Sequence, residues 1–116
     1  MVDKEKDMSN FGWNNTIQKM GKLNSIKSLL HKLYPLWQNG KVTVLLYSAL
    51  NTVGFADFNG IDNIDGYIDN IVVDMVYIRT ANGEVDIYLH EYETYRFNKD
   101  NSLTIVCTNK EHKILF

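Results

Sequence analysis

Residues 71–92, IVVDMVYIRTANGEVDIYLHEY, decide the fold of this chain. Two runs rich in β-branched and aromatic residues flank the pair Asn82-Gly83, the strongest short-range sequence signal for a β-hairpin with a two-residue type I′ turn. A turn at that pair fixes which residues lie opposite one another. The predicted opposite pairs are Ala81 with Glu84, Thr80 with Val85, Arg79 with Asp86, Ile78 with Ile87, Tyr77 with Tyr88, Val76 with Leu89 and Met75 with His90.

Because side chains alternate along a strand, this hairpin has two different faces. One face is apolar and is predicted to belong to the core: Val76, Ile78, Val85, Ile87 and Leu89. The second face mixes aromatic, basic and acidic side chains: Met75, Tyr77, Arg79, Asp86, Tyr88, His90 and Tyr92. Only this second face suggests a function, because no sequence motif elsewhere in the chain indicates an activity.

The length and composition indicate a single globular domain. A chain of 116 residues can bury a sizeable core without disulfide bonds or structural metal ions. Its one cysteine, Cys107, cannot form an internal disulfide, which favours a reducing cytoplasm. No run approaches the roughly 18–20 apolar residues of a membrane span, and the N-terminus lacks the apolar segment of a signal peptide. We therefore expect a cytoplasmic protein that makes no membrane contact.

Charge is distributed unevenly along the chain, although the formal net charge is only −2. Residues 1–41 contain seven lysines and three acidic residues, whereas residues 42–116 contain five basic and eleven acidic residues. Nonspecific binding to nucleic acid depends on neutralising phosphates, and the overall charge does not favour it. A basic segment on an acidic body can still present one positive face.

The N-terminal third predicts one helix after a tail. Residues 1–12 alternate charges with little to bury and are expected to be flexible, which leaves residues 13–116 as the domain. A helix is predicted over residues 24–34, with Asn24 as its cap and Pro35 ending or kinking it. Its apolar stripe comprises Leu23, Ile26, Leu29, Leu30, Leu33 and Trp37.

The rest of the chain predicts strands separated by short turns. Residues 41–50, 103–108 and 114–116 are expected to be strands, and a short one is expected near residues 54–58 inside a loose, turn-rich segment. With the hairpin this gives an α+β fold. We expect a helix followed by five or six antiparallel strands in a small barrel or strongly twisted sheet.

The sequence motifs give little support for a metal, cofactor or catalytic site. DFNGIDNIDGYID, residues 57–69, fails as a calcium loop because Ile61 or Ile64 falls where an oxygen ligand is required. The three histidines are scattered, no nucleotide or nucleophile motif is present, and Cys107 sits mid-strand with no neighbour to activate it. We expect no metal, no cofactor and no enzymatic activity.

The tyrosine-bearing face of the hairpin leaves three interpretations open. Opposed aromatic rings stabilise hairpins by roughly 0.2–1 kcal/mol per pair, so its role could be purely structural. Aromatic and basic side chains on a sheet also stack and hold unpaired bases of RNA or single-stranded nucleic acid. In that case the binding residues are Tyr77, Arg79, Tyr88 and Tyr92, with Lys27 and Lys32 from the helix meeting phosphates. Finally, the face or the acidic loop from Asp57 to Asp74 could bind another protein.

The order of a helix followed by a small antiparallel barrel containing DGYIDNIVVDMVYIRTANGEVDIYLHEYETYRF, residues 65–97, resembles small RNA-associated barrels. PUA-like domains are one such family. Sm-like barrels are another, echoed by Gly66-x-Ile68 followed by Asp74. In outline, residues 22–116 are similar to the PrgU-type regulators of bacterial, Gram-positive conjugative plasmids. The resemblance implies a regulatory protein that acts through RNA, and it transfers no individual functional residue.

Overall fold

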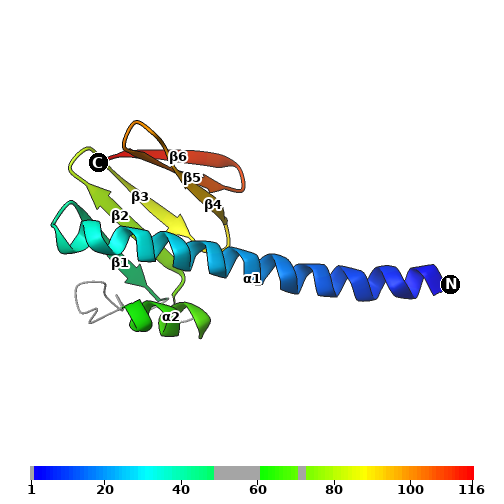
Figure 1. The fold of residues 1–116 in the computed structure, drawn as a ribbon. Helices are drawn as coiled ribbons and strands as arrows, with labels where there is room; N and C mark the ends of the chain where they lie inside the picture. Colours follow the sequence, from blue (N-terminus) through cyan, green and yellow to red (C-terminus); the bar gives the residue numbers. More distant parts are fainter. Residues whose placement is uncertain (1, 49–60, 71–72) are drawn as a thin grey trace.

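The computed structural model describes the backbone of residues 2–48, 61–70 and 73–116, and of these all side chains except those of residues 2–19 and 61–62 (Figure 1). The elements in chain order are α1 (Val2–Gln38), β1 (Val42–Tyr47), α2 (Ile61–Asp69), β2 (Met75–Thr80), β3 (Gly83–Tyr88), β4 (Tyr92–Phe97), β5 (Ser102–Cys107) and β6 (Lys110–Leu115). The described strands form two antiparallel three-stranded sheets, β1-β2-β3 and β4-β5-β6. The α+β class is confirmed, but these strands do not form one closed barrel.

Helix α1 is longer than the sequence indicated. It runs for 37 residues, about 55 Å at 1.5 Å per residue, which accounts for the longest dimension of the molecule, 58 Å. Figure 1 shows its N-terminal part extending beyond the strands. The backbone is helical from Val2 onward, within the segment expected to be a flexible tail, and the mobility of that tail stays a prediction.

The predicted ends of this helix were wrong. Asn24 lies inside α1 and therefore does not cap it, and Pro35 lies within the last turn. The helix ends instead in a Schellman motif, in which Gly40 takes a left-handed φ of 73° and the Lys41 N–H donates to the Leu36 carbonyl at 2.8 Å. Pro35 costs only one hydrogen bond near the helix end, and the packing of the preceding turns outweighs that loss.

Three sides of α1 contact three different parts of the body. Ile26, Leu29, Leu30 and Leu33 are fully buried and share one hydrophobic cluster with the inner face of the first sheet. A second side is polar and faces α2. A third side faces β4, and Figure 1 shows α1 crossing the first sheet and passing beside β4. The helix therefore packs against both sheets, which also contact each other through β3 and β6.

The hairpin between β2 and β3 forms, but its predicted register was wrong by two residues. The turn residues are Ala81 and Asn82, so Arg79 lies opposite Glu84 and Tyr77 opposite Asp86. Neither turn residue has a positive φ, which a type I′ turn requires. The Thr80 hydroxyl explains the shift, because it accepts the Asn82 N–H at 3.2 Å and donates to the Leu115 carbonyl of β6 at 2.6 Å.

A shift of two residues leaves every side chain on its predicted face. The apolar face of the hairpin is therefore confirmed as core: Val76, Ile78, Val85 and Ile87 are buried, and Leu89 packs partly buried against them. The tyrosines of the other face are not opposed as expected. Tyr88 lies opposite Met75, and Tyr77 opposite Asp86.

A β-bulge in β4 changes which residues share a face of the second sheet. The register with β5 shifts between Tyr92 and Thr94, so that Tyr92 lies opposite Cys107 whereas Tyr95 lies opposite Ile105. Tyr92, Tyr95 and Phe97 consequently point to the same side, toward α1. Simple alternation along the chain would have placed Tyr92 on the side opposite to the other two.

Helix α2 lies where the sequence indicated turns. Its Ile64 and Ile68 are fully buried, and its acidic residues contact α1. The short strand expected near residues 54–58 lies outside the described residues. β1 is confirmed over Val42–Tyr47 and β5 over Ser102–Cys107, and the last strand is longer than predicted. Among the described residues, no helix is both long and apolar enough to cross a lipid bilayer.

Candidate functional site

The outer face of the first sheet carries three of the six predicted site residues. Tyr88 is 47% exposed and Arg79 is exposed, whereas Tyr77 is half-buried. Two carboxylates accompany them: the Tyr77 hydroxyl donates to Glu84 at 2.6 Å, and Asp86 lies across from Tyr77. The hydrogen bond to Glu84 raises the pKa of the Tyr77 phenol. This face therefore combines aromatic rings with a local excess of negative charge, which repels phosphates.

Tyr92 cannot stack on a base, contrary to the prediction. Its side chain is 1% exposed because the bulge in β4 turns it beneath α1. Its hydroxyl is 2.6 Å from the Ser25 hydroxyl of the helix, and burial raises the pKa of Tyr92 to about 12. The ring is part of the core that attaches the second sheet to α1.

The two helix lysines lie apart from the predicted tyrosine face. Both are on α1, which covers the inner face of the first sheet, whereas Tyr77 and Tyr88 lie on the outer face. Lys27 forms an ion pair with Asp69 of α2, and His31 one turn later is 3.2 Å from Asp65. Lys32 lies on the side of the helix that faces β4. The six predicted residues thus do not assemble into one site.

A different aromatic row lies between α1 and β4. On the helix, Ser25, Ser28 and Lys32 follow one stripe, with spacings of three and four residues. Ser25 contacts Tyr92, and the Ser28 hydroxyl is 2.8 Å from the Tyr95 hydroxyl. The Lys32 ammonium lies 5.5 Å from the centre of the Tyr95 ring and 5.9 Å from that of Phe97. These distances are within the range of cation–π contacts.

Exposure increases along this row. Tyr92 is buried, Tyr95 is half-buried and Phe97 is 39% exposed. The Phe97 ring is edge-on to Tyr95 at 6.0 Å and stacked on Phe116 at 6.0 Å with an interplanar angle of 16°. We call Tyr95, Phe97 and Phe116 the aromatic ladder. It adjoins the buried Tyr92 at one end and reaches solvent at the other, near the C-terminal end of α1.

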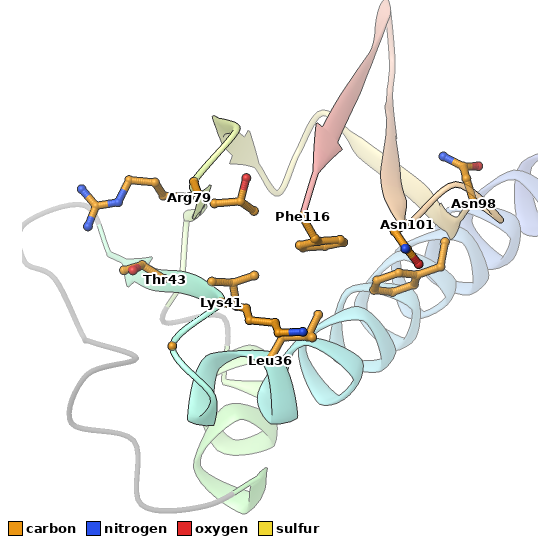
Figure 2. A pocket seen from close by; sticks show the side chains of 12 residues that line it. Leu36, Lys41, Thr43, Arg79, Asn98, Asn101 and Phe116 are labelled. Carbon is orange, nitrogen blue, oxygen red and sulfur yellow. The ribbon is translucent and has the colours of Figure 1, made fainter.

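The open end of the ladder leads into a cavity of about 950 Å³ (Figure 2). The last turn of α1, the turn into β1, the β2–β3 turn and the β4–β5 turn surround it. Phe97 and Phe116 line it together with Leu36 and the exposed Lys41. No carboxylate side chain occurs among the described residues that line this cavity, and its charged side chains are those of Lys41 and Arg79.

Two acidic residues of the second sheet and its turns, Asp100 and Glu111, form ion pairs with basic side chains of the same sheet. Asp100 is bound by Lys113 at 3.1 Å and by Ser102, and these hydrogen bonds lower the pKa of the Asp100 carboxyl, with that from Ser102 contributing most. Glu111 lies 3.6 Å from Arg96 on the sheet face that points away from α1. Lys32 beside the ladder and Lys41 in the cavity form no ion pair among the described residues.

Two further titratable groups, Cys107 and His112, are shielded from solvent. Cys107 is a buried free thiol, and burial raises its pKa, so it holds its proton. His112 is half-buried, its Nε2 has no hydrogen-bond partner among the described residues, and burial lowers its pKa. In the part of the chain that the structure describes, no three His, Cys, Asp or Glu side chains gather closely enough to hold a metal ion.

Sequence reasoning missed the ladder for two reasons. Tyr95 and Phe97 share the parity of Ile87 and Leu89, which suggested core, and the bulge that regroups them leaves no clear signal in the sequence. Phe116 is 19 positions from Phe97, so only the pairing of β4 with β5 and of β5 with β6 brings the rings together. Lys32, which lies over the ladder, was found in advance as a basic side chain on the polar side of the helix.

No family model matches this sequence, and neither the curated proteins nor the solved structures contain one significantly similar to it.

Proposed function

We propose that this protein is a non-enzymatic regulator that binds RNA or single-stranded nucleic acid through the aromatic ladder and the lysines beside it. The observation that carries the proposal is the position of the Lys32 ammonium over two adjacent rings, one of which is 39% exposed. Rings offer stacking surfaces to unpaired bases, and ammonium groups next to them meet the phosphates between those bases.

The energetics favour a weak, salt-dependent interaction. Stacking of one base on one aromatic side chain contributes roughly 1–3 kcal/mol and tolerates changes of base. The exposed ring of Phe97 and the partly buried ring of Phe116 therefore support binding of a short strand. Lys32 and Lys41 add phosphate contacts, and each contact releases a counterion and makes binding sensitive to salt. With a net charge of −2, the chain adds no long-range attraction of its own.

The resemblance to PUA-like and SH3/Sm-like barrels is part of the same proposal. In such folds a small set of antiparallel strands presents side chains to RNA, and here two three-stranded sheets share one core with α1. A regulatory role through RNA in a bacterial plasmid context follows from that resemblance alone. The ladder supports an RNA partner independently, since its rings and charges are properties of this chain.

The test is a fluorescence titration of labelled single-stranded RNA with the protein at low and at physiological salt. We expect binding at low salt that weakens as salt rises. Phe97→Ala should weaken it roughly tenfold or more, because one stacking contact is lost. Tyr88→Ala is the matched control, an exposed ring on the other sheet, and should leave the affinity unchanged. Absence of binding at low salt would contradict the proposal.

A second candidate function is the binding of another protein through the outer face of the first sheet. It is favoured by the combination of exposed Tyr88 with Glu84 and Asp86, which suits a basic partner surface. The acidic segment from Asp57 to Asp74 supports it less, because Asp65 and Asp69 are used in contacts with α1. Loss of partner capture in Tyr88→Ala, with RNA binding intact, would separate the two functions.

A further inference from the structure

The cavity at the end of the ladder has the size of a ligand site. Its volume of about 950 Å³ lies within the roughly 300–1,000 Å³ that small-molecule pockets have. Its rim includes exposed residues from three separate turns, Gly40, Ala81 and Asn101. A ligand can therefore enter from solvent without a change of fold.

One wall of the cavity suits a flat ring. Phe116 and Phe97 are nearly parallel, and Leu36 and Val42 extend the apolar surface beside them. An aromatic ligand prefers an offset arrangement on such a ring, at centroid distances of about 4.5–7 Å. Figure 2 shows the Phe116 ring facing the space that Leu36 and Lys41 close from below.

The polar groups of the cavity suit an anion with a hydrogen-bonding edge. Lys41 forms no ion pair among the described residues, and Figure 2 shows its ammonium end beside Leu36, with the guanidinium of Arg79 directed away from it. Thr43 and Asn101 line the same space with a hydroxyl and an amide, groups that both donate and accept. Asn98 also lines it, but its amide N–H groups bind Ser102 and Thr104.

We infer that this cavity binds one nucleoside monophosphate unit, with its base against Phe116 and its phosphate beside Lys41. The base supplies the flat ring and the polar edge, and the phosphate supplies the negative charge. The unit can be part of a strand that lies on the ladder, and this form rests on the function proposed above. It can equally be a free mononucleotide, which presents the same chemistry.

The test titrates the four nucleoside 5′-monophosphates into the protein by calorimetry, with ribose 5-phosphate as the control that lacks a base. We expect at least one mononucleotide to bind and ribose 5-phosphate to bind at least tenfold more weakly. Lys41→Gln should weaken mononucleotide binding about tenfold. Lys99→Gln, which removes the same charge from the exposed β4–β5 turn outside the cavity, should leave it unchanged.

Filling the cavity distinguishes the two sources of the ligand. Ala81→Trp places a bulky side chain on the rim and should abolish mononucleotide binding, with a thermal melt to verify the fold. If the mononucleotide also displaces labelled RNA, and Ala81→Trp weakens RNA binding about tenfold, the unit belongs to a strand. If mononucleotides bind but RNA does not, the inference stands and the strand function fails. If RNA binds with no mononucleotide binding and no effect of either cavity variant, the inference is overturned and the strand function remains.

Discussion

The two sheets of this protein carry their aromatic side chains in opposite electrostatic surroundings. On the outer face of β1-β2-β3, Tyr77 and Tyr88 lie with Glu84 and Asp86, and the Tyr77 hydroxyl is tied to a carboxylate. On β4, Tyr95 and Phe97 lie beneath the ammonium group of Lys32. The same residue type therefore serves different purposes. Rings beside carboxylates exclude phosphates, whereas rings beside lysines attract them.

The second sheet carries one row of rings whose surroundings change from buried to exposed along its length. At its buried end, Tyr92 attaches β4 to the helix through Ser25, and at its open end Phe97 meets solvent and the cavity. The bulge in β4 makes this possible by directing both ends of the strand toward α1. Substitutions at the buried end of the row should therefore lower stability, and substitutions at the exposed end should weaken the proposed binding.

The largest expected effect is at the buried end. Tyr92→Ala should lower the free energy of unfolding by about 3–5 kcal/mol, as truncation of other buried aromatic residues does. Tyr88→Ala on the first sheet should lower it by less than about 1 kcal/mol, because that ring is 47% exposed. Urea unfolding followed by circular dichroism measures both. Equal losses would mean that the two tyrosines do not differ in role.

Of the two serines that contact the row, the one at the buried end should contribute more to the free energy of unfolding. Ser25→Ala leaves the buried Tyr92 hydroxyl without its partner and should cost about 1–3 kcal/mol of unfolding free energy. Ser28→Ala removes an equivalent contact to Tyr95 at the solvent-exposed part, where water can replace it, and should cost less than about 0.5 kcal/mol. Chemical denaturation of the two variants side by side decides this, and a larger loss for Ser28→Ala would contradict it.

The two helix lysines provide a matched pair for strand binding. Lys32→Gln should weaken RNA binding and reduce the slope of log affinity against log salt by about 0.7, the value for one phosphate contact with a single strand. Lys27→Gln removes the same charge from a side chain already paired with Asp69, and the slope should not change. Titrations at several salt concentrations give both slopes. An equal decrease in the two variants would point to general electrostatics rather than to the ladder.

The smallest expected effect concerns pH and the half-buried His112 of β6. Burial lowers the pKa of His112 below its ordinary value of 6.5, so the unfolded chain takes up the proton first as pH falls. The contribution of His112 to the free energy of unfolding should therefore be fully present above pH 6.5, and it should be lost as the pH falls below that value. His112→Gln should remove this part of the decrease, whereas His90→Gln, at an exposed position, should not. Melting temperatures across the mildly acidic range test this, and an unchanged pH dependence in His112→Gln would contradict it.

The sequence by itself determined the α+β class, the apolar face of the hairpin, and the positions of β1 and β5. These features depend on local alternation and helical spacing, which are properties of neighbouring residues. It also indicated that Cys107 is structural, and its burial in β5 agrees with this. It placed the hairpin turn one residue too late, which shifts the strand pairing by two, because the hydroxyl of Thr80 and the contact of that residue with β6 outweigh the preference of Asn82-Gly83.

Only the tertiary structure decided the candidate site. Tyr92 is not part of the candidate site because a bulge regroups the side chains of β4, and a bulge is a property of strand pairing. Lys27 left it because α2 supplies an acidic partner. The candidate site includes Phe97, Phe116 and Lys41 because three turns and the last strand converge at the end of α1. Such convergence depends on contacts between residues far apart in the chain, which no local pattern records.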